Sequence, residues 1–122
     1  MKIISGSKKS ILIKAPKNLP NYTRPTTGKV KESLFNIISN KYNINEIAVL
    51  DLFSGSGNIS FEFSSRGCND ILAIDNNFRC IKFIKETAIT LELKIDTKKN
   101  DYLDFLNKND KKFDLIFADP PY

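Results

Sequence analysis

Between residues 47 and 118 the chain alternates short apolar runs with segments of helical periodicity, and this alternation restricts the possible folds more than any other feature. The apolar runs predict strands at residues 47–53, 71–75, 95–99 and 113–118. Helices are expected between them at residues 57–66, 78–93 and 102–107. Strands that are joined by crossover helices and covered on both faces form parallel sheets. The sequence therefore predicts an α/β fold built on a parallel sheet.

The start of the chain has a different pattern. Apolar and polar residues alternate in segments 1–5 and 10–14, which are joined by a glycine-containing turn, and this predicts a β-hairpin. Residues 15–25 contain three prolines and predict an extended linker. We therefore divide the chain into an N-terminal part, residues 1–45, and an α/β core, residues 46–122.

One helix is expected between the linker and the core. Thr26 or Thr27 can cap its N-terminus, because a threonine hydroxyl accepts from the first unpaired backbone N–H groups of a helix. Its predicted apolar face consists of Val30, Leu34, Ile37 and Ile38. The helix is expected to end near Asn40, so that hairpin, linker and helix precede the sheet.

Positive charge is concentrated in the N-terminal part. Residues 1–45 hold nine Lys or Arg and one acid, whereas residues 46–122 hold ten Lys or Arg and thirteen acids. A basic arm on a mildly acidic body is typical of proteins that bind the phosphate backbone of nucleic acids. A lysine-rich solvated surface has the same composition, so charge alone leaves both interpretations open. The candidate phosphate contacts are Lys8, Lys9, Lys14, Arg24, Lys29 and Lys31.

Composition excludes several classes of protein. The 122 residues are enough for one compact core but short for two domains. The chain has no histidine and two cysteines, so a zinc site of Cys and His ligands is not expected, and no metal is assigned. No run approaches the roughly 18 apolar residues of a membrane span, and the first residues lack the apolar centre of a signal peptide. We expect a cytoplasmic protein that binds neither a membrane nor a metal.

The first strand runs into a glycine-rich turn. Ligands of open α/β sheets bind outside the carboxyl ends of the strands, and Gly55 and Gly57 allow a tight turn that brings backbone N–H groups to a ligand there. A plain structural turn and a dinucleotide-binding turn are the alternatives, but the spacing is not GxGxxG and no P-loop lysine follows. The acid Asp51 on the strand favours a ligand with an ammonium group, because a carboxylate repels a pyrophosphate.

The next two strands also end in acids. Asp75 can accept from both hydroxyls of a ribose, and Asp101 can accept from an adenine amino group. Each could instead cap the helix that follows it. Together with Asp51, the three acids indicate a site for a nucleoside joined to an amino acid.

The fourth strand is followed by Asp119-Pro120-Pro121-Tyr122. Two prolines lack backbone N–H donors, which leaves the Asp119 carboxylate and the Pro120 carbonyl as acceptors. Such acceptors suit an exocyclic –NH2 group, and Tyr122 offers a ring on which a base can stack. A Pro-Pro turn that closes a strand is the alternative for the prolines alone.

The sequence resembles the class I Rossmann-like methyltransferases that act on amino groups. The resemblance rests on VLDLFSGSGNISF at residues 49–61, on Ile74-Asp75, and on FDLIFADPPY at residues 113–122. The stretch RPTTGKVKESLFNII at residues 24–38, after the opening MKIISG, is similar to one family of this class, the bacterial 16S rRNA guanine-N2 methyltransferases. The resemblance covers essentially the whole chain.

This resemblance implies S-adenosylmethionine as the cofactor and transfer of its methyl group to guanine N2 of 16S rRNA, free or in the small ribosomal subunit. It implies that Asp51, Gly55 and Gly57 hold the methionine part, with Asp75 on the ribose and Asp101 on the adenine. The full set of candidate cofactor residues is Asp51, Phe53, Ser54, Gly55, Ser56, Gly57, Asp75, Asn76, Asp101 and Tyr102. The candidate catalytic residues are Asp119, Pro120, Pro121 and Tyr122, and the basic residues above become RNA contacts.

The resemblance also implies that the N-terminal helix borders the cofactor and RNA entrance through Lys31, Glu32 and Phe35. The full-length protein is expected to be a monomer. The family continues past DPPY with strands and helices that complete the sheet, so we expect a longer gene product. We also expect the 122-residue chain either to self-associate through residues 113–118 or to be poorly soluble, and to have little or no activity. The alternative functions are a DNA adenine-N6 methyltransferase and a cofactor-binding fragment without catalytic activity.

Overall fold

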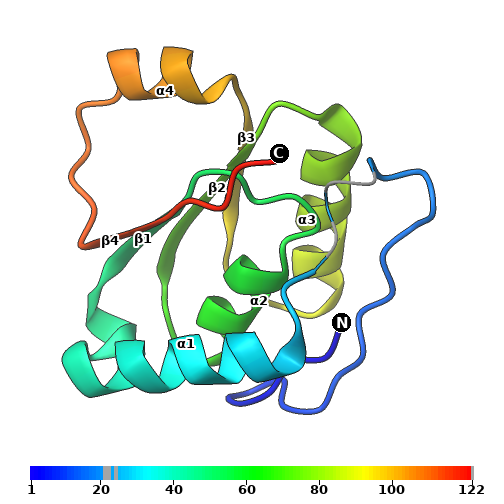
Figure 1. Ribbon diagram of the computed structural model, residues 1–122, viewed down its shortest axis with the longest axis vertical. Coiled ribbons are helices and arrows are strands. Elements are labelled where there is room, and N and C mark those ends of the chain that lie inside the picture. Colours follow the sequence, from blue (N-terminus) through cyan, green and yellow to red (C-terminus); the bar gives the residue numbers. More distant parts are fainter. Residues whose placement is uncertain (21–22, 24, 122) are drawn as a thin grey trace.

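The computed structural model describes residues 1–20, 23 and 25–121. Its centre is a parallel sheet of four strands in the order β3-β2-β1-β4 (Figure 1). The strands are β1 (Ala48–Asp51), β2 (Asp70–Asp75), β3 (Asp96–Lys99) and β4 (Leu115–Phe117). The parallel α/β fold predicted from the alternation of strands and helices is confirmed.

Three crossover helices connect the strands of the sheet, and one longer helix precedes the first strand. The helices are α1 (Gly28–Lys41), α2 (Asn58–Ser65), α3 (Phe78–Thr90) and α4 (Tyr102–Lys108), with the short 3-10 helix η2 (Ile44–Glu46) before β1. Thr27 caps α1 and Asp101 caps α4, as two of the sequence alternatives predicted. Within the described residues, no helix combines the length and the apolar character needed to cross a membrane.

The two faces of the sheet carry different helices because successive strand residues point to opposite sides. Val49 of β1 packs with residues of α1 and α2, whereas the next residue, Leu50, packs with Phe105 of α4. In β2, Ala73 packs with α3 and Ile74 packs with α4. The sheet is thus covered by α1, α2 and α3 on one face and by α4 on the other, which explains the near-continuous apolar strands.

The strands end at a common edge, which Figure 1 shows near the chain's C-terminus. Asp51 pairs with Ala73 of β2 and with Phe117 of β4, and Asp75 pairs with Lys99 of β3. The first strand is shorter than the predicted 47–53, because the chain leaves the sheet after Asp51 to form the glycine-rich turn. The register therefore brings the acids at the ends of β1 and β2 to one edge.

The buried face of α1 differs from the predicted one. Val30 is 57% exposed and Ile37 is 61% exposed, whereas Lys31, Phe35 and Ile38 are buried. The buried stripe is rotated by about one residue because the ammonium of Lys31 has polar partners inside the molecule, described below. The apolar pattern alone did not include this lysine. The prediction was wrong for Val30 and Ile37, whereas Ile38 is buried as predicted and Leu34 is half-buried against the core.

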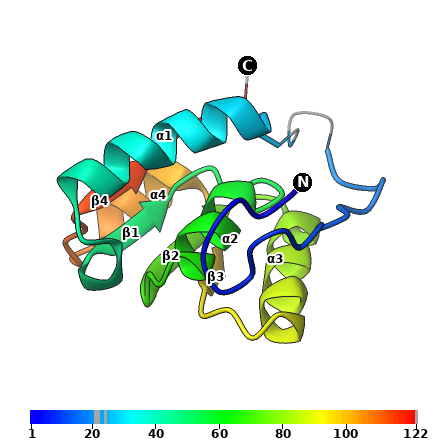
Figure 2. The same cartoon turned by 90° about the horizontal axis from the view of Figure 1, so that it is seen from below.

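The predicted N-terminal β-hairpin is not seen as a pair of regular strands. Lys2 and Leu12 form a single antiparallel bridge, and backbone hydrogen bonds connect Ile3 to Ile11. The backbone N–H groups of Ile4 and Ser5 do not continue this ladder, because they donate to the Glu62 carboxylate of α2 at 2.9 and 3.1 Å. Residues 1–14, which we call the N-terminal arm, pack across α2 and α3 (Figure 2).

Candidate functional site

Two adjoining hollows lie at the carboxyl edge of the sheet. The larger, of about 290 Å³, is lined by Leu52, Phe53, Gly55, Asp75, Asn76, Asn100, Asp101, Tyr102, Asp119 and Pro121. The smaller, of about 50 Å³, is lined by Thr23, Pro25, Thr26, Asp51, Phe53, Ser54, Gly55, Ser56, Asn58, Ile59, Phe117 and Asp119. Phe53, Gly55 and Asp119 line both. We refer to the two hollows together as the edge site.

The glycine-rich turn contributes to the lining of both hollows. Gly55 has φ 54° and Gly57 has φ 86°, in the left-handed region that favours glycine. A Cβ atom on Gly57 would lie 2.7 Å from Ile84 Cγ1 and 2.9 Å from an atom of the Phe61 ring. Gly57 therefore allows α2 to pack closely, and it lines neither hollow, whereas Gly55 lines both.

Asp51 is a buried carboxylate with one unused oxygen. It is 1% exposed, and its Oδ2 accepts from Ser60 Oγ at 2.7 Å. Oδ1 has no partner among the described residues, and neither has the buried Ser54 Oγ. Burial raises the pKa of Asp51 to about 7; the hydrogen bonds from Ser60 oppose this rise, and the charges of Asp75 and Asp119 add to it. The smaller hollow is thus poised to receive a group that can donate a hydrogen bond or carry positive charge.

Asp75 is held at the edge by two backbone N–H groups. Its Oδ2 accepts from Gly55 N and its Oδ1 accepts from Asn77 N, each at 2.9 Å. It does not cap α3, since Asn77 Oδ1 accepts from the first free N–H groups of that helix. The helix-cap alternative for Asp75 is therefore wrong. A carboxylate oxygen has more than one lone pair, so the fixed side chain retains acceptor capacity toward the larger hollow.

The far wall of the larger hollow comes from the start of α4. Asp101 caps this helix through Oδ2, which accepts from Leu103 N at 3.2 Å and from Asp104 N at 3.3 Å. The Tyr102 ring lies 5.1 Å from the Phe53 ring, centroid to centroid, with the planes tilted by 49°. These two rings give the larger hollow apolar surface, whereas the acids Asp75, Asp101 and Asp119 make the rest of its lining polar.

The segment after β4 reaches the same edge. Asp119 lines both hollows and Pro121 lines the larger one. Asp119 is exposed, and Pro120 between these two residues is half-buried. Tyr122, a candidate base contact, lies outside the described residues. The structure thus brings the carboxylates of Asp51, Asp75, Asp101 and Asp119 to one site.

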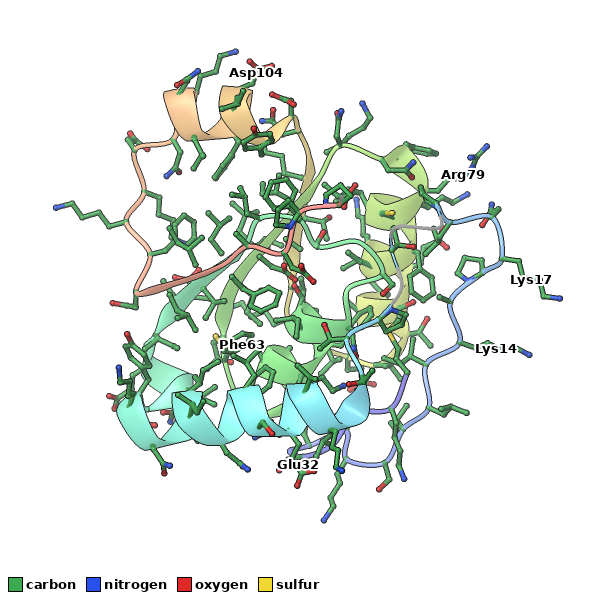
Figure 3. All side chains as sticks on the ribbon, in the orientation of Figure 1. Lys14, Lys17, Glu32, Phe63, Arg79 and Asp104 are labelled. Carbon is green, nitrogen blue, oxygen red and sulfur yellow. The ribbon has the colours of Figure 1, made fainter. Side chains whose placement is uncertain are left out.

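The candidate RNA contacts are distributed unevenly. Lys9, Lys14 and Lys29 are exposed, and Figure 3 shows Lys14 pointing away from the body. Lys8 is half-buried, and its backbone N–H donates to Ser65 Oγ at 3.0 Å. Arg24 lies outside the described residues. The exposed lysines remain compatible with both interpretations of the basic arm.

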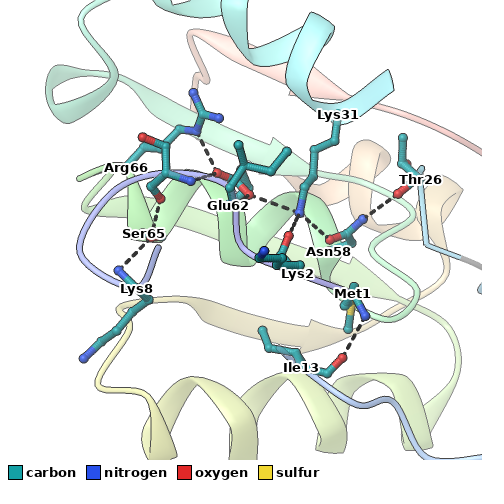
Figure 4. A network of polar contacts seen from close by, with 12 residues as sticks. Met1, Lys2, Lys8, Ile13, Thr26, Lys31, Asn58, Glu62, Ser65 and Arg66 are labelled. Carbon is teal, nitrogen blue, oxygen red and sulfur yellow. Dashed lines mark hydrogen bonds and ion pairs between the residues drawn. The ribbon is translucent and has the colours of Figure 1, made fainter. Parts of the chain in front are cut away.

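Lys31 is the exception, because it lies inside a polar network between α1, α2 and the arm (Figure 4). Its Nζ lies 3.0 Å from Glu62 Oε1 and donates to Lys2 O at 2.7 Å and to Asn58 Oδ1 at 2.8 Å. The side chain is 2% exposed, so it is not available to RNA phosphates, and its assignment as an RNA contact was wrong. Asn58 Nδ2 in turn donates to Thr26 O at 3.0 Å.

The expected entrance beside α1 also needs correction. Phe35 is fully buried, with its ring 4.6 Å from the Phe63 ring, and Arg66 lies over the same Phe35 ring. It belongs to the core and does not border an entrance. Glu32 is exposed but lines neither hollow.

The linker contributes to the edge site, which the sequence analysis did not predict. Thr23, Pro25 and Thr26 line the smaller hollow together with Asn58. The hydrogen bond from Asn58 to Thr26 explains how the linker is held there. Two of the three, Pro25 and Thr26, lie in the RPTT string that carried the family resemblance, which was the available signal.

Comparison of the sequence with known protein families identifies the family of this chain. The family described as "Conserved hypothetical protein 95" matches residues 1–122. The chain belongs to this family. The predicted resemblance to class I methyltransferases related to the 16S rRNA guanine-N2 enzymes is therefore confirmed at the level of the family.

Individual relatives carry methyltransferase names. The chain is 41% identical to "Putative rRNA methyltransferase YlbH" of Bacillus subtilis (strain 168), covering 100% of this chain and 67% of that protein. It is 38% identical to "Ribosomal RNA small subunit methyltransferase D" of Buchnera aphidicola subsp. Baizongia pistaciae, with 100% and 61% covered. A solved structure described as "Putative methyltransferase yhhF from Escherichia coli" superposes with TM-score 0.87 at 27% identity, covering 100% of this chain and 65% of that one. The chain spans about two thirds of these proteins or less.

Proposed function

We propose that this chain forms the cofactor-binding part of an enzyme that transfers a methyl group from S-adenosylmethionine to the exocyclic N2 amino group of a guanine in 16S rRNA. The observation that carries the proposal is the edge site, where three strand-end acids meet the acceptor segment Asp119–Pro121. The relative from Buchnera aphidicola, named as a small-subunit rRNA methyltransferase, supports the choice of substrate.

The residues of the edge site fit the cofactor. The unpartnered Asp51 Oδ1 and Ser54 Oγ suit the ammonium of its amino-acid part, because buried acceptors without donors favour a cationic ligand. Asp75, fixed by two N–H groups, has lone pairs for ribose hydroxyls. Phe53 and Tyr102 offer apolar surface to an adenine ring, with the Asp101 carboxylate beside them. When bound, S-adenosylmethionine supplies a methyl group on a sulfonium centre.

Asp119 and Pro120 are assigned to the target base. An exocyclic amine is a poor nucleophile because its lone pair is delocalised into the ring. The Asp119 carboxylate and the Pro120 carbonyl accept its two hydrogens and orient the lone pair for attack, so that catalysis rests on positioning and on acceptor electrostatics. The amine loses its proton after methylation, when it is cationic, so no strong base is needed. Asp119 is exposed, which gives that proton a route to water.

The test is methyl transfer by the whole enzyme, of which this chain is the cofactor-binding part, from tritium-labelled S-adenosylmethionine to 30S subunits that lack this methylation, followed by nucleoside analysis. We expect labelled N2-methylguanosine. Asp119→Ala should reduce turnover by about 100-fold or more, as loss of a transition-state contact does, with cofactor affinity unchanged within a few-fold. Asp104→Ala, at an exposed acid of α4 outside the edge site, is the matched control. Normal turnover by Asp119→Ala would show that the acceptor assignment is wrong.

The same assay separates the alternatives. Label in N6-methyladenine of a DNA substrate, with none in rRNA, would identify the DNA enzyme. Cofactor binding by calorimetry without transfer to either substrate would identify a binding module. The acceptor segment alone does not distinguish guanine from adenine, since both carry an exocyclic amino group.

A further inference from the structure

A groove runs between the N-terminal arm and α3, outside the edge site. One end, of about 370 Å³, is lined by Ile11, Leu12, Ile13, Lys14, Phe83, Glu86, Thr87, Thr90 and Leu91. The other end, of about 430 Å³, is lined by Pro16, Asn18, Phe78, Arg79, Lys82, Phe83 and Glu86. Phe83 and Glu86 line both ends, so the two hollows form one groove, which we call the arm groove.

The arm groove combines basic residues with an exposed aromatic ring. Phe78 is 63% exposed at the first position of α3, and Arg79 and Lys82 lie beside it on the same helix. No ion pair within the described residues occupies these basic groups, and Glu86 is the one acid among the lining residues.

The groove leads to the edge site. Asn76 lines the larger hollow of that site, Asn77 caps α3, and Phe78 follows directly. A polynucleotide whose target base lies in the edge site would therefore have neighbouring nucleotides within reach of Phe78. Single-stranded RNA is recognised by aromatic rings that stack on splayed bases and by basic groups that contact the backbone.

We propose that the arm groove binds single-stranded rRNA next to the target nucleotide, with a base stacked on Phe78 and phosphates held by Arg79 and Lys82. The inference rests on the proposed rRNA substrate and adds a contact surface that the basic arm alone did not indicate. Charge favours RNA as the occupant, because the lining residues of the groove include three basic residues, Lys14, Arg79 and Lys82, and one acid, Glu86.

The test is filter binding of the protein to a protein-free 16S rRNA transcript across a range of salt concentrations. Phe78→Ala should weaken binding by about 5- to 100-fold, the range for losing one stacked base. Ile89→Ala is the matched control, because Ile89 is 69% exposed on the same helix and does not line the groove.

The salt dependence of binding tests the phosphate contacts. Arg79→Gln with Lys82→Gln should reduce the slope of log affinity against log salt by about 1.4, the value expected for losing two phosphate contacts to a single strand. Lys85→Gln with Lys94→Gln, at two exposed lysines outside the groove, controls for net charge.

The outcomes separate this inference from the proposed function. If the whole wild-type enzyme methylates rRNA but its Phe78→Ala variant binds rRNA as Ile89→Ala does, the arm groove is wrong and the function stands. If the whole wild-type enzyme neither binds nor methylates rRNA, both fail. If Phe78→Ala abolishes self-association in light scattering and leaves RNA binding intact, the groove is a protein interface. Unchanged S-adenosylmethionine affinity in the variants, measured by calorimetry, shows that each one is folded.

Discussion

Asp51 and Glu62 are both buried carboxylates on the same side of the fold, yet their surroundings are opposite. Glu62 is 0% exposed and Asp51 is 1% exposed. Glu62 accepts from the backbone N–H groups of Ile4 and Ser5 and lies in ion pairs with Lys31 and Arg66. Asp51 accepts one side-chain hydrogen bond and has an oxygen without a partner in the described part of the chain.

The difference appears in the pKa of each group. Burial by itself raises the pKa of Glu62. The hydrogen bonds from Ile4, Arg66 and Lys31 lower it by more than burial raises it, so the pKa lies below its ordinary value. Burial raises the pKa of Asp51 to about 7, and its one strong hydrogen bond, from Ser60, does not offset this. A buried charge with a full set of partners holds the structure together, whereas one with an unused oxygen is available to a ligand. The four predictions below test this comparison.

The largest effect is expected for Glu62→Gln. The substitution leaves the Lys31 ammonium buried without its counter-charge, which should lower the free energy of unfolding by about 3–5 kcal/mol. Urea denaturation followed by circular dichroism measures it. The double variant Lys31→Met, Glu62→Gln removes both charges but keeps an amide oxygen as an acceptor for the backbone N–H groups of Ile4 and Ser5, so it should recover part of the loss. A loss below about 1 kcal/mol in the single variant would contradict the role given to the network.

Replacing the carboxylate of Asp51 by an amide should stabilise the fold at neutral pH, whereas the same replacement at Glu62 should destabilise it. The folded-state pKa of about 7 lies above the unfolded value of 3.8, so the protonated form stabilises the fold at low pH. This stability is present below about pH 4 and is lost as the pH rises to 7. Asp51→Asn does not ionise, so its unfolding free energy relative to wild type should increase by about 2–4 kcal/mol between pH 4 and pH 8. A pH-independent difference between the two proteins would show that Asp51 titrates normally.

Cofactor binding should also report on Asp51. An ammonium beside this residue favours the carboxylate, so S-adenosylmethionine binding at pH 6 should release a proton and should tighten as the pH rises to 8. Calorimetry in buffers of different ionisation enthalpy measures the proton. Asp51→Asn should abolish the release and weaken binding by about tenfold or more, as loss of a charged hydrogen bond does. Proton release that persists in this variant would assign it to another group.

The smallest effect is expected at Asn58, which connects the two regions through Lys31 and Thr26. Asn58→Ala should lower the unfolding free energy by about 1–2 kcal/mol, because Lys31 keeps two of its three partners. It should weaken cofactor binding a few-fold through the loosened linker. Asn69→Ala, at an exposed asparagine, is the control in both the urea and the calorimetric measurements. If Asn58→Ala and Asn69→Ala had the same unfolding free energy and the same cofactor affinity, the connecting role given to Asn58 would be wrong.

Much of the fold and of the edge site could be predicted from the sequence alone. The apolar runs located the four strands, and the acids within or just after these runs were expected at a common edge, because parallel strands end on the same side of a sheet. The caps at Thr27 and Asp101 were readable because a cap depends on residues within three positions. Local periodicity and chain order were sufficient for these features.

Only the tertiary structure decided the features that depend on distant partners. Ile4 donates to a carboxylate 58 residues away, which replaces the regular hairpin, and Lys31 reaches Asn58, 27 residues on, which rotates the buried face of α1. Asn58 holds Thr26 at the smaller hollow across 32 residues. In each case a buried polar group needs a partner, and the nearest partner in space is remote in sequence. Periodicity reports which side chains are apolar, but it does not report which buried polar groups will find one another.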